Sequence, residues 1–351
     1  MFGSQSRDNR QRSTGRTRTR TARAAATALA LGLLGTSAFT STSVAATADS
    51  AVSRNNRYDL GEIGTFNMAG GNVKRSIPEE VWEEEEDTYT GQHAVDALYR
   101  SIADHQPAFL TVQEACGDWM DELAEKLPTY TISFDPVKTG SGADAQCYNP
   151  IQDENDPGYG GPDRNSPRSL YGNAMITKNT YFGTGATAKS HSLGTPSGEQ
   201  REMLCVTSNF LSTAACSAHT TSARTDQGAD YRDTEIANAV NILETEYAGY
   251  VHFLGGDFNA EPLDNEMKQI YSSRYSTDTT GRYGEVDSPC ETDTPPTPGP
   301  ACLSGGATTL SGEKFDYIFL TRGVVEVNSA GPTKSLYSDH LPLWASLTIT
   351  F

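Results

Sequence analysis

The chain has 351 residues, with 45 Asp and Glu against 27 Lys and Arg, and its formal net charge is −18 at pH 7. A chain this acidic does not hold a polyanion through a broadly basic surface, so any anionic substrate must be captured locally, by metal ions and a few arginines. The length of residues 49–351 fits one large α/β domain better than two.

The first 48 residues have the pattern of a secretory signal peptide. Arginines recur from Arg7 to Arg23, an apolar run continues to about Phe39, and small residues follow. The apolar run contains glycines and is shorter than the ~20 residues that span a bilayer, which disfavours an uncleaved anchor. No Arg-Arg pair precedes it, which favours the general secretory route. We therefore predict a secreted, extracellular protein with a polar lead-in at residues 49–57 and no transmembrane span in the mature chain.

Six cysteines occur in the chain, and an even number in an exported protein indicates disulfides. Metal binding by these cysteines is the weaker alternative, because the sequence has no Cys-x-x-Cys motif. Two of the pairs flank an expected hairpin and a Pro-rich loop. We predict bridges between sequence neighbours: Cys116–Cys147, Cys205–Cys216 and Cys290–Cys302.

The first half of the domain alternates strands and helices. Apolar residues at helical spacing predict helices over 94–102, ending before Pro107, and over 119–127. Strands are expected at 60–68, 108–112 and 129–137. Residues 138–169 are rich in Gly, Pro, Asp and Asn, and we expect a surface excursion near the site.

The second half is richer in strands. Strands are predicted at 174–177, 203–210, 216–219, 251–254, 315–320 and 341–351. An amphipathic helix is expected over 234–247, and a second Gly/Pro/Thr-rich loop over 278–310. Because strands outnumber helices, and helices join some strand pairs while hairpins join others, we expect two packed sheets with helices outside them.

Polar residues stand where six of these apolar strands end. Each patch alone has an ordinary interpretation: a Gly-Asp-x-Asn sequence can be a turn whose side chains bond their own backbone, and an Asp-His pair can cap an element. Loops that leave a rigid scaffold can also gather such side chains into one site. The patches are Asn67, Gln113-Glu114, His219, Asp257-Phe258-Asn259, Asp316 and Asp339-His340.

In this order the patches resemble the endonuclease/exonuclease/phosphatase superfamily, which includes deoxyribonuclease I, inositol polyphosphate phosphatases and neutral sphingomyelinases. The resemblance covers residues 58–351. It implies an α+β fold, a four-layer α/β/β/α sandwich of two packed mixed sheets flanked by helices. It also implies metal-dependent hydrolysis of phosphate esters, and it is only weakly specific for the substrate.

The resemblance assigns Glu114, Asp339 and Asn67 to the metal site. Carboxylate oxygens suit Mg²⁺, which prefers hard oxygen ligands, and Mn²⁺ or Ca²⁺ are alternatives. Asn67 is neutral and would orient Glu114 or touch a phosphate oxygen.

Five further residues carry implied catalytic roles. His340 would be the general base or would stabilise the phosphorane-like state, with Asp316 holding its ring. Asp257 would orient or deprotonate the attacking water, and Asn259 would donate to a phosphate oxygen. His219 would bind phosphate or protonate the leaving group. Its carboxylate partner in some related nucleases has no match by motif here, although Asp135 lies in the right stretch.

Substrate contacts are expected from Asn173 and Tyr171, for which a plain strand entry is the alternative. Arg201 would steady a phosphate, unless it is a surface arginine.

We therefore predict a secreted, monomeric phosphodiesterase that cleaves DNA as an endonuclease. The alternatives are a phosphatase or a sphingomyelinase/phospholipase C-type enzyme of the same fold, and a binding protein that has lost catalysis. Loops rich in Gly, Pro, Asp and Thr disfavour a membrane substrate. A binding protein would be expected to lack one of the site residues, and none is missing.

Overall fold

The computed structural model describes residues 57–70, 92–150, 162–194, 198–291 and 297–351. The predicted signal peptide and nearly all of the lead-in lie outside these ranges. Over the ranges that are described, no helix combines the length and apolarity needed to cross a bilayer.

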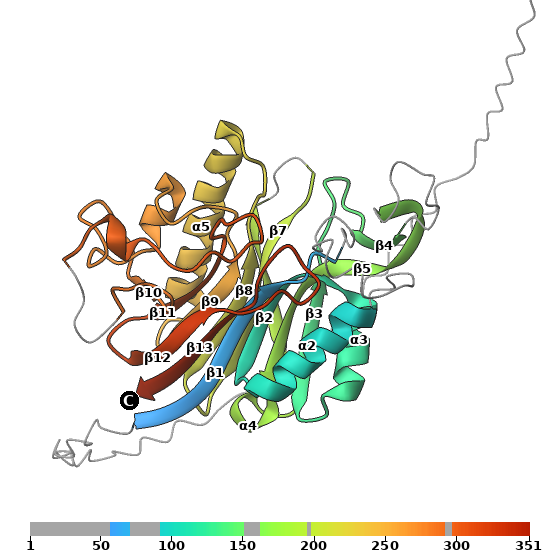
Figure 1. Ribbon diagram of the computed structural model, residues 1–351, viewed down its shortest axis with the longest axis horizontal. Helices are drawn as coiled ribbons and strands as arrows, with labels where there is room; N and C mark the ends of the chain where they lie inside the picture. Colours follow the sequence, from blue (N-terminus) through green and yellow to red (C-terminus); the bar gives the residue numbers. More distant parts are fainter. Residues whose placement is uncertain (1–56, 71–91, 151–161, 195–197, 292–296) are drawn as a thin grey trace, which may run out of the picture. The chain divides into compact units, whose positions relative to one another are not determined.

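Two mixed β-sheets form the centre of the domain (Figure 1). The first sheet has seven strands, in the order β12 (Val325–Pro332), β13 (Leu343–Thr350), β1 (Arg57–Asn67), β2 (Phe109–Cys116), β5 (Pro162–Lys178) and β3 (Tyr130–Pro136), with β4 (Gln146–Pro150) paired to β5. The second sheet has six strands, in the order β10 (Tyr283–Glu285), β11 (Asp316–Thr321), β9 (Val251–Asp257), β8 (Thr213–His219), β7 (Arg201–Ser208) and β6 (Ala188–Gly194).

Helices cover the outer face of each sheet (Figure 1). The first sheet packs against α2 (Gln92–His105) and α3 (Gly117–Lys126), and the second packs against α5 (Asp226–Glu246). The short elements are α4 (Asn179–Phe182), η1 (Asn265–Gln269) and η2 (Pro300–Cys302).

Strand β11 shows why the central strands are apolar without a break. Its residues Tyr317 and Phe319 pack in the layer with α5, while Ile318 and Leu320 pack in the layer between the sheets. A strand buried on both faces has no solvent-facing positions and so has no polar alternation. A third apolar layer separates the first sheet from α2 and α3. The predicted four-layer α/β/β/α sandwich is confirmed.

Parallel pairing brings the polar patches to one edge of the sandwich. In the first sheet β1 runs parallel to β2, with Asn67 opposite Gln113. In the second, β8 runs parallel to β9 with His219 opposite Asp257, and β11 enters antiparallel with Asp316 opposite the same Asp257. Parallel neighbours end at the same edge of a sheet. The side chains at the ends of β1, β2, β8 and β9 therefore lie at one edge of the sandwich.

The two sheets approach one another closely beside this edge, at Gly255. A Cβ atom placed on Gly255 would lie 2.4 Å from the Thr111 hydroxyl oxygen of the facing strand β2. Glycine is therefore required by the distance between the sheets, not by a turn.

Helix α5 begins eight residues before the expected start, at Asp226 instead of Thr234. Its first turns bury polar groups, so the apolar periodicity starts late. Arg232 is 5% exposed and donates to Glu266 and to two backbone carbonyls, and the Thr225 side chain caps the helix by accepting from the Gly228 amide at 3.1 Å.

The expected excursion at 138–169 is wrong in part, because it contains β4 and the first half of a β5 strand that is 17 residues long. Strands β6 and β12 were not predicted. Each is an edge strand with many partly exposed positions, so neither has a strong apolar pattern. The loop expected at 278–310 contains the short β10 and η2.

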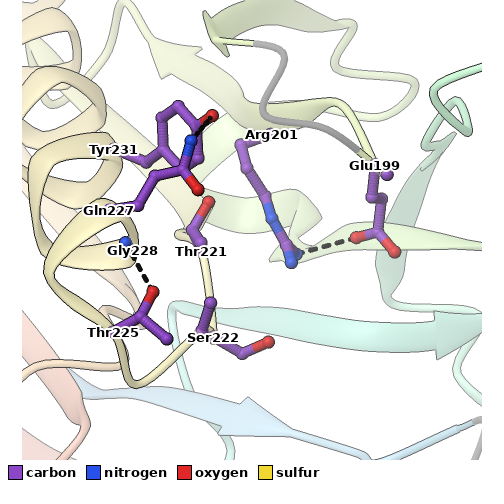
Figure 2. A pocket seen from close by; sticks show the side chains of 10 residues that line it. Glu199, Arg201, Thr221, Ser222, Thr225, Gln227, Gly228 and Tyr231 are labelled. Carbon is purple, nitrogen blue, oxygen red and sulfur yellow. Dashed lines mark hydrogen bonds and ion pairs between the residues drawn. The ribbon is translucent and has the colours of Figure 1, made fainter.

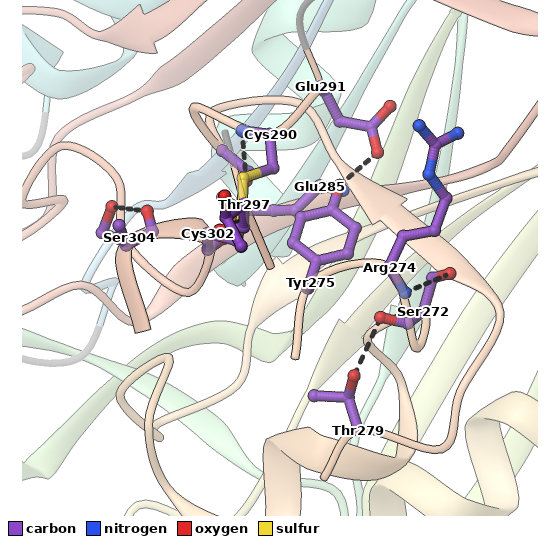
Figure 3. The surroundings of a disulfide bond; sticks show 12 residues. Ser272, Arg274, Tyr275, Thr279, Glu285, Cys290, Glu291, Thr297, Cys302 and Ser304 are labelled. Carbon is purple, nitrogen blue, oxygen red and sulfur yellow. Dashed lines mark hydrogen bonds between the residues drawn. A yellow bond between two sulfur atoms is a disulfide. The ribbon is translucent and has the colours of Figure 1, made fainter. Parts of the chain in front are cut away.

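All three predicted disulfides are confirmed, and they pair all six cysteines. Cys116–Cys147 joins the end of β2 to β4, and Cys205–Cys216 joins opposite residues of β7 and β8. Figure 3 shows Cys290–Cys302 beside the ring of Tyr275, in the same apolar cluster. Closing this short loop is worth roughly 3 kcal/mol through the entropy of the unfolded chain.

We predict that Gly255→Ala lowers the free energy of unfolding by about 1–3 kcal/mol, because the added methyl group overlaps Thr111. Thermal and urea denaturation would measure this loss. Gly331→Ala is the matched control, since a Cβ atom there meets nothing within 4 Å. Equal stabilities for the two variants would contradict the close approach of the sheets.

Candidate active site

Glu114 is aimed at the site by a bulge in β2. The β2–β5 register shifts between Val112 and Ala115, so that Gln113 and Glu114 together face Asn173. Glu114 has φ = 52°, a left-handed conformation that is unfavourable for a side chain of this kind. Such backbone strain persists where the surrounding structure enforces it, and it is concentrated at functional sites.

Asn67 connects carboxylates of the two sheets. Its Nδ2 donates to Glu114 Oε1 at 3.2 Å and to Asp257 Oδ2 at 2.9 Å. Its Oδ1 accepts from the Ala69 amide at 2.9 Å, which orients the side-chain amide. Asn67 is fully buried, so its contacts hold Glu114 and Asp257 in fixed relative positions.

His340 is held by Asp316 and by its own loop. Its Nδ1 lies 2.7 Å from Asp316 Oδ2, and its Nε2 lies 3.8 Å from Asp257 Oδ2. The Ser338 hydroxyl accepts from the His340 amide at 3.1 Å and donates to the Asn67 carbonyl at 2.8 Å. The C-terminal Ser-Asp-His segment is therefore tied directly to the end of β1.

Asn259 shapes the turn after β9. Asp257 Oδ1 accepts from the Asn259 amide at 2.8 Å, and Asn259 Nδ2 donates to the Thr220 carbonyl at 3.1 Å. Asn259 has φ = 48°, which asparagine tolerates better than most residues. Both interpretations of the Gly-Asp-x-Asn segment therefore apply: it forms a backbone turn, and it places its side chains at the site.

His219 faces the same carboxylates from β8. Its Nε2 lies 3.8 Å from Glu114 Oε1 and 3.7 Å from Asp257 Oδ2, and its Nδ1 lies 3.4 Å from Arg201 Nη1. A guanidinium only donates, so Nδ1 accepts and Nε2 carries the proton. Asp135 is not a partner of His219; its carboxyl group is hydrogen-bonded to that of Glu202.

Burial and neighbouring charges shift the pKa values of the site residues. Burial raises the pKa of Glu114 and of Asp257. Burial lowers the pKa of His219 well below its usual range, and the positive charges of Arg201 and His340 add to the shift. Burial also acts to lower the pKa of His340, but the negative charges of Asp316 and Asp257 outweigh it and hold that pKa well above the usual range.

The donor set fits a divalent cation. Glu114, His219 and Asp257 offer ligand atoms within 4.8 Å of one another, as do Asp257, Asp316 and His340. Burial raises the pKa of Glu114 and of Asp257, so a cation bound beside them would favour their ionised forms. Hard carboxylate oxygens in such surroundings are suitable ligands for Mg²⁺ or Mn²⁺.

The remaining predicted residues surround this group. Asp339 is exposed, and its charge is close enough to Glu114 to contribute to raising the pKa of Glu114. Burial raises the pKa of Tyr171 well above its usual range, with contributions from the charge of Glu114 and from a hydrogen bond to it. Asn173 is 2% exposed opposite the β2 bulge. Arg201 is 9% exposed, so it is not a surface arginine. All eleven predicted residues thus lie in or around one site.

Two supporting residues were missed by the sequence analysis. Thr308 Oγ1 accepts from the Phe315 and Asp316 amides at 3.0 and 2.9 Å, which positions the start of β11. Glu199 pairs with Arg201 at 2.7 Å. Both lie outside the strand-end motifs, so no sequence pattern marked them.

We predict that Asp316→Asn lowers the pKa of His340, because the largest favourable charge is removed while burial remains. NMR titration of the histidine ring signals of the metal-free protein would measure the pKa of His340 in both proteins. The raised pKa means that this pair stabilises the fold below the unfolded-state pKa, and that the contribution is lost as pH rises through the folded-state value. In the variant this pH-dependent stability should shrink.

The His191 ring, which bonds the Tyr247 hydroxyl, serves as the internal control. Its titration should not move. An unchanged His340 titration in Asp316→Asn would contradict the assigned pairing.

Comparison with known proteins agrees with this geometry. The model of the Endonuclease/Exonuclease/phosphatase family matches residues 64–340. No curated protein sequence is significantly similar to the chain.

Solved structures share the fold at low identity. The human Nocturnin catalytic domain, with a bound sulfate anion, is 16% identical with a TM-score of 0.52, covering 85% of this chain and 98% of that one. D. rerio TDP2, in complex with a single-strand DNA product, is 12% identical with a TM-score of 0.51, covering 84% and 99%. A mannosyl-6-phosphatase of Bacteroides thetaiotaomicron is also 12% identical, with a TM-score of 0.51, covering 82% and 98%.

The family match spans most of the chain, from β1 to His340, and the fold is shared with these structures. The protein therefore belongs to the endonuclease/exonuclease/phosphatase family of phosphoester hydrolases.

Proposed function

We propose that the protein is a secreted, divalent-metal-dependent phosphodiesterase that cleaves DNA endonucleolytically. The observation that carries this proposal is the meeting of two histidines at one carboxylate. His219 Nε2 and His340 Nε2 lie 3.7 and 3.8 Å from the same Asp257 Oδ2, while Asn67 ties that oxygen to Glu114. Two imidazoles and two carboxylates grouped in this way are suited to orienting an attacking water and to binding a phosphoryl group.

Glu114 and Asp339 would hold the cation, with Asn67 orienting Glu114 through its amide. When bound, a divalent cation supplies neutralisation of the phosphoryl oxygens and of the leaving oxygen. Asp257, fixed by Asn67 and by the Asn259 amide, would orient the attacking water and accept its proton. Because the carboxylate is immobilised before substrate arrives, little reorganisation is required.

The histidines and Asn259 would act on the phosphoryl group. The charges of Asp316 and Asp257 raise the pKa of His340 and so favour its protonated form, which suits stabilising the phosphorane-like state better than acting as the base. His219, neutral with its proton on Nε2, would donate to a phosphoryl or leaving oxygen. Asn259 would donate to a phosphate oxygen, and Tyr171, Asn173 and Arg201 would contact the substrate around it.

The polyanionic substrate is captured by this site and not by the protein surface. A net charge of −18 repels DNA at long range, so binding depends on the cation, on His340 and on Arg201. The three disulfides agree with an extracellular protein, and a monomer is expected to suffice because the described residues bring all the predicted site residues together.

We predict that the purified protein nicks supercoiled plasmid DNA with Mg²⁺ and that EDTA abolishes nicking, because uncompensated carboxylates alone would repel phosphate. Gel electrophoresis of plasmid, RNA, sphingomyelin and phosphomonoester reactions would compare the substrate classes. Hydrolysis of only the lipid or the monoester would replace the DNA assignment by that class. The absence of metal-dependent turnover on every substrate would refute the proposal.

We predict that His340→Ala and Asp257→Asn each lower kcat by roughly 10²–10⁴-fold, the usual contribution of a positioned proton donor or acceptor. Steady-state rates on plasmid and circular dichroism of each variant would separate chemistry from folding. His105→Ala is the control, since His105 pairs with Glu62 on β1 away from the site. Near-normal turnover in either site variant would contradict its role.

A further inference from the structure

A cavity of about 310 Å³ adjoins the candidate active site on the side of β7. Figure 2 shows the side chains that line it, which come from the start of β7 and the segment before it, from the loop between β8 and α5, and from the first turns of α5. Arg201 belongs to both places, because it lines the cavity while its Nη1 lies 3.4 Å from His219 Nδ1. The cavity therefore begins one side chain away from the catalytic carboxylates. His219 lies between the two places, with Nδ1 toward Arg201 and Nε2 toward Glu114 and Asp257.

The loop between β8 and α5, which forms one wall of the cavity, is held in place by buried residues of α5. Glu235 is 1% exposed and accepts from both the amide and the hydroxyl of Thr221, at 2.8 and 2.7 Å. Arg232 donates to the Thr221 and Ala223 carbonyls at 3.1 and 2.9 Å. Gly228 packs so closely that a Cβ atom there would lie 1.9 Å from the Ala223 carbonyl oxygen. Two buried charged residues and a required glycine thus fix this wall before any ligand binds.

Arg201 lines the cavity, and one of its side-chain donors is left unpaired by the described residues. Its Nη1 is paired with Glu199 at 2.7 Å, but among the described residues its buried Nε has no hydrogen-bond partner. Arg201 is 9% exposed, so this donor does not reach bulk water freely. Leaving a buried donor unsatisfied is unfavourable, and a ligand acceptor that reached it would recover that loss.

The charge of the lining indicates which acceptor fits. Glu199 forms an ion pair with Arg201, so a second phosphate in the cavity would meet the Glu199 carboxylate as well as the guanidinium. The other polar lining side chains are neutral hydroxyls and one amide: Thr221, Ser222, Thr225, Gln227 and Tyr231. Neutral hydroxyls and amides, together with an Arg–Glu pair that both donates and accepts, match a polar ring bearing hydroxyl or carbonyl groups.

We propose that this cavity is a specificity subsite that binds the neutral polar group attached to the scissile phosphate, a nucleoside or a hexose. The assignment rests on the proposed phosphodiesterase function and adds the part of the substrate that the enzyme recognises. The Arg201 guanidinium donates to a carbonyl or hydroxyl of this group, Gln227 and Tyr231 contact it from α5, and the phosphate remains at His219 and His340. The recognised unit is one ring and not a long stretch of polymer, because the cavity is small.

The test uses phosphodiesters with the same p-nitrophenol leaving group. Thymidine 5′-(p-nitrophenyl phosphate) and the corresponding hexose 6-phosphate ester carry a ring, whereas bis(p-nitrophenyl) phosphate lacks the sugar. Ser222→Tyr, on the rigid loop, narrows the cavity. It should lower the preference for the ring-bearing ester over the minimal diester by roughly fivefold or more, mainly through KM. If the variant loses its preference for the thymidine ester, the ligand is a nucleoside. If it loses its preference for the hexose ester, the ligand is a hexose.

Ser273→Tyr is the matched control, because Ser273 is an exposed serine outside the cavity lining. It should preserve the substrate preference of the unmodified protein. Calorimetric titration with thymidine 5′-monophosphate and with hexose 6-phosphate supplies a readout that needs no turnover. Equal affinities of Ser222→Tyr and the unmodified protein for both ligands, or an unchanged substrate preference, would overturn the subsite. No hydrolysis of any diester by the unmodified protein, with weaker ligand binding in Ser222→Tyr, would instead reject the proposed function and keep the subsite.

Discussion

One amide nitrogen joins the two halves of the candidate active site. Asn67 Nδ2 donates to Glu114 from the first sheet and to Asp257 from the second. The two carboxylates would otherwise repel one another, and a shared donor lets both remain close without adding a charge. The Ser338 hydroxyl bonds the Asn67 carbonyl, so the loop that carries His340 is positioned by the same residue. The geometry of the site therefore depends on how the ends of the two sheets meet.

The close contact between the sheets makes this meeting possible. Gly255 lets β9 approach Thr111 of β2, and the layer between the sheets is mostly apolar, with Gln113 donating to Ser217 across it beside the site. Left-handed backbone at Glu114 and Asn259 then turns the two side chains at the strand ends. These conformations are unfavourable in isolation, and the packed sandwich together with the hydrogen bonds around each residue maintains them. A rigid scaffold thus supports a locally strained site.

Charge is arranged differently at the site and elsewhere in the chain. The protein as a whole carries a net charge of −18, yet the site places His340 and Arg201 beside its carboxylates. In a partly buried environment these few positive groups act over short distances with little screening. Selectivity for the group attached to phosphate would then come from the cavity beside Arg201, where charges cancel and hydroxyl groups dominate. Phosphate capture and recognition of the attached group would thus depend on different physical properties of neighbouring surfaces.

The apolar central strands, both helices over the first sheet, the four-layer architecture and the three disulfides could be predicted from sequence. Burial on both faces leaves a continuous apolar run, and amphipathic helices leave a periodic one, so these elements are visible locally. The edge strands β6 and β12 and the first turns of α5 could not be predicted. Exposed edges and buried ion pairs such as Arg232–Glu266 leave no apolar signal.

The sequence by itself determined which side chains stand at the strand ends, because chain order and strand length are local properties. Only the tertiary structure decided how they are oriented: that Asn67 bridges two carboxylates, that His219 faces Arg201 and not Asp135, and that a cavity opens beside it. Those contacts join residues that are far apart in the chain, such as Asn67 and Asp257, which are separated by 190 positions. They follow from sheet pairing and from the packing of one sheet on the other, which no short sequence pattern specifies.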